Sequence, residues 1–205
     1  MRVRPDAIYI TTPPCATMQD VEAALQKYGD KLLKQRDTLQ QNHIGNKLPI
    51  VSENFIFRLQ HTVTDRFQLK KEGCEYTLLC PENFDLCSTT QQKWLHSVIE
   101  KAMTQRAKEV LPHRLQQLAE KFSFVYKHTT IRIAHTRWGS CSSNGTISLN
   151  AYLIQLPDEL IDYVLLHELC HTRHMNHSPR FWELLDKCTG YRAKLLRKQL
   201  HDYKI

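Results

Sequence analysis

One segment constrains this chain more than any other, because it places ionisable side chains inside an apolar run. The segment reads His167-Glu168-Leu169-Cys170-His171 and follows Tyr-Val-Leu-Leu at 163–166. A helix that is apolar on nearly every side is a buried helix, and histidine and glutamate side chains are costly to bury without a partner. A metal ion would supply that partner. We therefore interpret the segment as a buried metal-site helix, in preference to a core helix that happens to carry histidines.

The spacing inside the segment suits a catalytic metal. On a helix, residues four apart such as His167 and His171 lie on one face, with about 5–6 Å between their Cβ atoms. Two imidazoles at that separation can converge on one Zn²⁺ at about 2.0–2.1 Å each. Glu168 projects about 100° further round the helix, so it can reach a water molecule at the metal without binding the ion. That position suits a general base acting on a water whose pKa the metal has lowered.

Two residues compete to be the third metal ligand. In a continuous helix His174 would lie about 10 Å along the axis from His167, which is too far for one ion to bind the whole stripe. His177 lies within Met-Asn-His-Ser-Pro at 175–179, where Asn, Ser and Pro favour the end of one helix and the start of another. We expect the chain to turn back there and bring His177 to the metal, with His174 as a supporting or substrate-facing group.

Composition limits the class of protein. The chain has 205 residues, of which 41% are hydrophobic and 24% charged, which is typical of a soluble globular domain. No apolar run approaches the roughly 18 residues of a membrane span, and the N-terminal stretch lacks the features of an export signal. The seven cysteines are scattered, which favours reduced thiols and a cytoplasmic protein. We expect no membrane partner.

The charge points weakly to an anionic partner. The net charge is +7 and the pI is near 9.0, which is compatible with nucleic acid or with phosphorylated ligands. The basic residues are spread along helical segments as ordinary solvated faces, and no motif for reading nucleic acid accompanies them. The expected partner is a polypeptide or a small phosphorylated substrate, with nucleic acid weakly supported.

The first part of the chain, residues 1–87, is expected to hold little chemistry. We predict a strand at 3–10, followed by a helix that Thr17 and Asp20 cap and that fades near Asn42. A small antiparallel sheet should follow, because alternating β-type runs are separated by polar turns. These runs lie at 50–59, 66–71 and 76–80.

The second part, residues 88–205, carries the metal-site helix. A long helix should open near Ser88 by capping and should kink or restart at Pro112. Strands at 130–134 and 146–149 should flank a tight Asn-Gly turn at 144–145. Pro157 and the acidic residues after it fit the first turn of the metal-site helix. Two short helices should then begin after Ser178 and near Tyr191.

Two stretches resemble a known family. RWGSCSSNGTISLN at 137–150 and IDYVLLHELCHTRHMNHSPRFW at 161–182 are similar to the YgjP-like metallopeptidase family, which is related to the WLM and SprT-type zinc peptidases. The resemblance implies one YgjP-like domain over 1–205. Its α+β fold would have a zincin-like metallopeptidase core at 88–205, a small antiparallel sheet and an N-terminal strand–helix extension. It also implies one Zn²⁺ bound by His167, His171 and His177, with Glu168 as the base.

The resemblance further implies where substrate binds. The strand at about 146–150 would border the cleft as an edge strand, and an extended polypeptide would pair with it through main-chain hydrogen bonds. Arg137 and Trp138 would then flank the cleft, although Trp138 could equally be a core anchor. Cys141 and Cys170 fit better as small buried hydrophobes than as ligands.

The leading hypothesis is a zinc-dependent hydrolase of the metallopeptidase type, in which Glu168 takes a proton from the attacking water and returns it to the leaving amine. Tyr191, His201 and His174 are candidates for stabilising the oxyanion. One alternative is a metal-dependent nucleoside-triphosphate (UTP) pyrophosphatase, an activity ascribed to some YgjP-like proteins. Another is a DNA- or protein-binding module with structural zinc, although structural zinc usually has four protein ligands.

Overall fold

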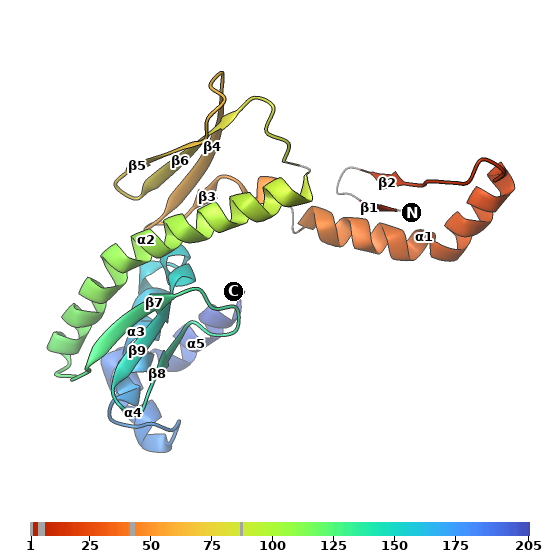
Figure 1. The fold of residues 1–205 in the computed structure, drawn as a ribbon. Helices are drawn as coiled ribbons and strands as arrows, with labels where there is room; N and C mark the ends of the chain where they lie inside the picture. The colour runs from red at the N-terminus through yellow and green to blue at the C-terminus, as the bar shows by residue number, and fades with distance from the viewer. Residues whose placement is uncertain (1, 4–6, 42–43, 87) are drawn as a thin grey trace. The chain divides into compact units, whose positions relative to one another are not determined.

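The computed structural model describes residues 2–3, 7–41, 44–86 and 88–205. It shows helices together with small β-sheets (Figure 1), so the predicted α+β class is confirmed. The chain forms two compact units. The first comprises residues 1–49, 59–68 and 79–97, and the second comprises 50–58, 69–78 and 98–205. The expected organisation as a single domain with parts 1–87 and 88–205 stays a prediction.

The first unit contains the N-terminal strands and a long helix. A single strand was predicted at 3–10, but the structure has two short strands, β1 (Arg2–Val3) and β2 (Ile8–Tyr9), which pair with each other antiparallel. Residues 4–6 lie outside the described residues. Helix α1 (Met18–Gln41) begins with the predicted capping box, because Thr17 Oγ1 donates to the Asp20 carboxylate at 2.7 Å and Asp20 N donates to Thr17 Oγ1 at 3.3 Å. Asn42, where this helix was expected to fade, lies outside the described residues.

A four-stranded sheet has the order β3-β4-β6-β5. Its strands are β3 (Ile50–Val51), β4 (Ile56–Thr62), β5 (Gln68–Glu72) and β6 (Glu75–Pro81). The single run expected at 50–59 is split into two strands, because Ser52 N donates to Phe55 O at 2.9 Å and closes a turn. Phe55, Phe57 and Tyr76 are fully buried and form an aromatic core within the second unit.

Helix α2 (Thr89–Lys121) runs through Pro112 as one helix, where a kink or restart was expected. No helix in the described part of the chain is both long enough and apolar enough to cross a membrane.

The second unit holds a three-stranded sheet with the order β7-β9-β8. Strands β7 (His128–Arg132) and β9 (Thr146–Asn150) are parallel, and β8 (Gly139–Cys141) is antiparallel to β9. The expectation that 146–150 forms an edge strand is wrong, because β9 has a hydrogen-bonded neighbour on both sides. The two edge strands are β7 and β8, and the sequence did not predict β8. Gly145 closes the predicted turn between β8 and β9 with φ of 80°.

Three helices lie beside this sheet (Figure 1) and build the site. Helix α3 (Asp158–His171) follows the short 3-10 helix η2 (Ala151–Gln155) and is buried along most of its length, as its apolar faces predict. Pro157 takes the N-cap position of α3, one residue before the expected N1. Helix α4 (Pro179–Cys188) starts with Ser178 at its N-cap and Pro179 at N1, as predicted, and α5 (Ala193–His201) follows.

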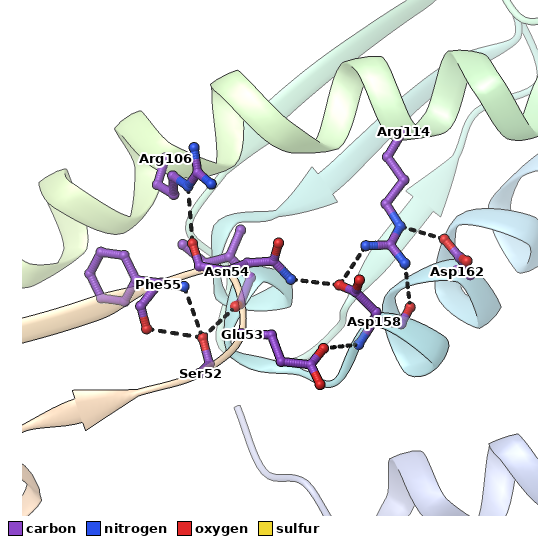
Figure 2. Close-up of polar contacts among 9 residues, drawn as sticks. Ser52, Glu53, Asn54, Phe55, Arg106, Arg114, Asp158 and Asp162 are labelled. Atoms are coloured by element: carbon purple, nitrogen blue, oxygen red, sulfur yellow. Dashed lines mark hydrogen bonds and ion pairs between the residues drawn. The ribbon is translucent and has the colours of Figure 1, made fainter. Parts of the chain in front are cut away.

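A polar network fixes the N-terminal end of α3 (Figure 2). The Asp158 N–H, left without an intrahelical partner at this position, donates to Glu53 Oε2 at 3.1 Å. The Asp158 carboxylate accepts from Asn54 Nδ2 at 2.7 Å and from Arg114 at 2.6 Å. Arg114 also donates through Nε to Asp162 at 2.5 Å. The helix that carries the histidines is therefore anchored by charged partners at its start.

Candidate metal centre

Three histidine rings converge at the C-terminal end of α3, which carries His167 and His171 one turn apart. His167 Nε2 lies 3.3 Å from His171 Nε2 and 3.1 Å from His177 Nε2. Two nitrogens bound to one tetrahedral Zn²⁺ at about 2.0–2.1 Å would lie about 3.3–3.4 Å apart. Candidate ligand atoms of these residues all lie within 4.8 Å of one another, and no other group of three metal-ligating residues of this kind occurs in residues 2–3, 7–41, 44–86 and 88–205. The donor set fits a metal ion.

Helix α3 ends earlier than the sequence indicated. We expected the break at 175–179, but the helix stops at His171 with Thr172 as its C-cap. The Thr172 hydroxyl donates to Leu169 O at 2.8 Å, and the His174 N–H donates to Cys170 O at 2.9 Å. These bonds tighten and close the last turn, so His174 is already outside the helix.

His174 supports the site through its backbone. His171 Nδ1 lies 3.0 Å from the carbonyl oxygen of His174. A carbonyl can only accept, so Nδ1 carries the proton and the lone pair of His171 Nε2 is free to bind a metal. The half-buried side chain of His174 takes no part in the histidine cluster, and its role toward substrate stays a prediction.

Two aromatic residues of α4 hold the imidazoles in place, and sequence reasoning missed both. Phe181 is fully buried, and its ring centroid lies 4.5 Å from that of His171, 4.8 Å from His177 and 5.0 Å from His167. The Trp182 ring stacks on His177 at 5.7 Å with an angle of 27° between the planes. The available signal was the Phe-Trp pair that follows the Ser-Pro helix start after one intervening residue.

The imidazoles of His167 and His171 are held as neutral bases. Burial, together with the neighbouring His171 and His177, lowers the pKa of His167 to about 3. Burial also lowers the pKa of His171. Neutral imidazole is the form that binds metal, so the electrostatics of the cluster favour an ion.

Glu168 is 5% exposed and lies against the backbone of β8. A Cβ atom at Gly139 would lie only 2.7 Å from Glu168 Oε1, so the glycine leaves the space that the carboxylate occupies. Burial raises the pKa of Glu168 to about 7, against an opposing effect of the Arg137 charge. Gly139 was quoted in the sequence motif without a role, and this contact gives it one.

Two hollows meet at Gly139, His167 and Glu168. The larger has a volume of about 580 Å³ and the smaller about 260 Å³. The larger is also lined by His171, His177, Thr136, Arg137, Ser140, Cys141 and Met175. The smaller is also lined by Trp138, Tyr163, Val164, Arg197 and Leu200. Substrate therefore has space on both sides of the candidate base.

The other predicted residues divide between these hollows and the surface. Arg137 lines the larger hollow and Trp138 the smaller. Tyr191 is 79% exposed and His201 is exposed, and neither residue lines either hollow. Burial raises the pKa of Cys141, so its thiol is a poor source of a metal-binding thiolate.

Cys170 is fully buried and lies outside the histidine cluster. A hydrogen bond with Cys188, together with burial, raises the pKa of its thiol.

Asn150 is a further supporting residue that the sequence reading left without a role. It is 2% exposed, and its side-chain Nδ2 donates to Ala134 O at 2.6 Å and to Arg137 O at 2.9 Å. The Asn150 N–H also donates to Trp138 O at 2.9 Å. One buried amide therefore shapes the loop that brings Arg137 and Trp138 to the cleft.

Two solved structures are similar to part of this chain. The crystal structure of the metallopeptidase zymogen of Pyrococcus abyssi abylysin is 26% identical, with a TM-score of 0.41 over 44% of this chain and 91% of that chain. The metallopeptidase zymogen of Methanocaldococcus jannaschii jannalysin is 22% identical, with a TM-score of 0.36 over 43% and 96%. No curated protein matches the chain.

The family comparison covers nearly the whole chain. The model of the YgjP-like, metallopeptidase domain matches residues 1–203, and it agrees with the resemblance carried by 137–150 and 161–182. The chain belongs to the YgjP-like family of metallopeptidase domains.

Proposed function

We propose that the protein is a zinc-dependent peptidase whose single zinc ion is bound by His167, His171 and His177. The observation that carries the proposal is the convergence of three Nε2 atoms, with separations from His167 of 3.1 and 3.3 Å. Three protein ligands leave one position of a tetrahedral ion open, as in catalytic rather than structural zinc sites. An ion held there would act as a Lewis acid toward a carbonyl oxygen and toward water.

Glu168 serves as the general base in this proposal. It follows His167 directly on α3, and Gly139 leaves its carboxylate room beside the cluster. The carboxylate takes a proton from the water that adds to the scissile carbonyl. It then passes the proton to the amide nitrogen as the C–N bond breaks, so the leaving group departs as a neutral amine.

The free edge of β8 is the proposed docking strand for substrate, in place of β9. Asn150 N donates to Trp138 O, and Ser142 N donates to Thr146 O, so residues 138 and 142 bond inward to β9. Because residues of an antiparallel strand alternate between bonded and non-bonded pairs, Gly139 and Cys141 direct their N–H and C=O groups away from β9. An extended polypeptide can pair with these groups next to Glu168.

Metal analysis and a cleavage assay test the proposal. Purified protein is analysed for bound metal, and wild type and Glu168→Gln are compared on an unstructured polypeptide and on nucleoside triphosphates including UTP. We expect zinc in both proteins, peptide cleavage by wild type, and a rate at least about a hundredfold lower in Glu168→Gln, as for loss of a general base.

A surface variant controls for non-specific effects. Glu183→Gln changes a carboxylate on α4 whose side chain is 68% exposed and pairs with Lys187, and it should cleave like wild type. Hydrolysis of UTP by wild type without peptide cleavage would refute the peptidase and favour a pyrophosphatase. Zinc binding that stabilises the fold without either activity would favour a structural zinc module.

A further inference from the structure

The smaller hollow contains a positive charge that the proposed mechanism does not use. Arg197 of α5 lines this hollow together with Trp138, Tyr163 and Leu200. His167 and Glu168 form part of the same wall. Any group bound in the hollow therefore lies next to the candidate metal ligand and the candidate base.

Arg197 is oriented by an aromatic ring rather than by a carboxylate. Its guanidinium carbon lies 5.0 Å from the centroid of the Trp182 ring, and stacking of this kind leaves the N–H groups at the edge of the guanidinium available. No carboxylate among the described residues forms an ion pair with Arg197, whereas Arg114 pairs with two carboxylates and Arg192 with one. The nearby Asp186 instead accepts from Ala193 N at 3.1 Å.

The walls of the hollow would strengthen binding of an anion to Arg197. Tyr163 and Val164 are each 3% exposed, so this side of the hollow is part of the core. Arg197 itself is exposed, so the buried wall excludes water on one side of its guanidinium, and there a charge-assisted hydrogen bond gains strength. The volume of about 260 Å³ lies below the range of about 300–1,000 Å³ typical of small-molecule sites, so it suits a single side chain or a chain end.

We propose that this hollow binds a carboxylate of the peptide substrate, with Arg197 as a specificity-determining residue. The proposal rests on the peptidase function proposed above. The planar guanidinium matches a carboxylate with two parallel N–H···O bonds. Two sources carry this group near a scissile bond: the side chain of Asp or Glu, and the C-terminal carboxylate of the substrate.

Binding to a protein that does not cleave tests the proposal directly. Zinc-loaded Glu168→Gln protein is titrated calorimetrically with short peptides that carry Glu, Gln or Lys at each position in turn, with a free or an amidated C-terminus. We expect at least about tenfold tighter binding of the acidic peptide at one position, or of the free C-terminus, as for charge-assisted hydrogen bonds. The free and amidated series separate the two sources.

Variants in the same background assign the preference to Arg197. Adding Arg197→Gln should abolish the preference for the carboxylate, and Arg197→Glu should turn it toward Lys. Lys198→Gln is the matched control, because Lys198 lies next on α5, is exposed and lines neither hollow. Equal zinc content in all variants would show that a change in peptide preference does not come from a loss of metal.

The outcomes separate the two proposals. A carboxylate preference that survives Arg197→Gln, or the absence of any preference in the protein with Arg197 intact, overturns the assignment of Arg197. Failure of wild type to cleave any peptide refutes the peptidase but leaves the binding comparison to decide on Arg197.

Discussion

The two ends of helix α3 both gather charged or ionisable groups, and they do so in opposite ways. At the start, the Asp158 carboxylate meets Arg114 at 2.6 Å and Asn54 at 2.7 Å, and its N–H meets Glu53 at 3.1 Å. At the C-terminal end, the Nε2 atoms of His167 and His171 lie 3.3 Å apart and face each other. The first cluster contains donors and acceptors in matched pairs. In the second cluster, the lone pairs of imidazole nitrogens face one another without matching donors.

This difference separates a structural cluster, at the N-terminal end of α3, from a candidate ion-binding cluster at its C-terminal end. Buried polar groups are stable when each is hydrogen-bonded by a partner, and the N-terminal network of α3 meets that condition within the chain. Converging neutral imidazoles do not meet it, because at most one proton can be shared between two facing nitrogens. In the proposed site, a cation would accept all three lone pairs and complete the second cluster. Removing partners from each end in turn therefore separates the two roles.

Removal of the metal should change the thermal stability most, because the chain itself supplies no other partner for the converging imidazole nitrogens. Zinc at a thousandfold excess over its dissociation constant stabilises a protein by about 4 kcal/mol, which for 150–250 residues corresponds to a rise in Tm of about 8–16 °C. We expect that shift in wild type on adding zinc to chelator-treated protein, measured by differential scanning calorimetry.

Histidine variants assign that shift to individual ligands. His177→Ala should lose the zinc-dependent rise in Tm, whereas His174→Ala should keep it, because His174 contributes its carbonyl oxygen to His171. The reverse result, with the shift retained in His177→Ala and lost in His174→Ala, would falsify the ligand set.

Gly139→Ala should separate the base from the metal. The added Cβ would lie 2.7 Å from Glu168 Oε1, so the carboxylate must move while the three imidazoles keep their places. Displacing a general base lowers the rate by about a hundredfold or more, and we expect peptide cleavage to fall accordingly with zinc content unchanged.

Gly29→Ala is the control for this glycine substitution, because no atom lies within 4 Å of a Cβ built at Gly29 in α1. It should keep full activity and add about 0.5–1 kcal/mol to the free energy of unfolding, as alanine does inside a helix. Unchanged cleavage by Gly139→Ala would show that Glu168 does not need this position.

What the sequence predicted well rests on short-range geometry. The shared face of His167 and His171 follows from the helical repeat, and the Thr17–Asp20 box follows from the orphan N–H groups of a helix start. The turn at Gly145 was predicted from the Asn-Gly pair, and the φ of 80° at Gly145 agrees with it. Each of these features depends on residues within one turn of the chain. Most individual helices and strands were predictable for the same reason, whereas the α+β fold was expected from the family resemblance.

What the sequence did not show depends on contacts between distant residues. Strand β8 is three residues long and has no alternation of its own, so its place at the edge follows only from pairing with β9. Arg197 reaches the site because α5 packs against α3. The anchoring of Asp158 by Glu53 and Arg114 joins residues that lie far apart in the sequence. No local rule of propensity or spacing reports such partners.

Arg114→Met should break the N-terminal cluster with a smaller effect than metal removal. The substitution leaves Asp158 and Asp162 without their cation, and Arg114 is only 19% exposed at its side chain. Loss of one partner from a partly buried, hydrogen-bonded charge network costs about 1–3 kcal/mol, below the 3–5 kcal/mol of a fully buried pair. Urea denaturation of chelator-treated protein measures this change without any contribution from zinc.

Arg192→Gln is the matched control for Arg114→Met at the start of α3. Arg192 also bonds an acidic residue of the first turn of α3, Glu159, but the two side chains are 49% and 48% exposed, so its loss should cost less than about 1 kcal/mol. Both variants should keep the zinc-dependent rise in Tm, because neither residue touches the histidines. If Arg114→Met also lost zinc affinity, the anchor at the start of α3 would be part of the metal site, and the two ends would act as one unit.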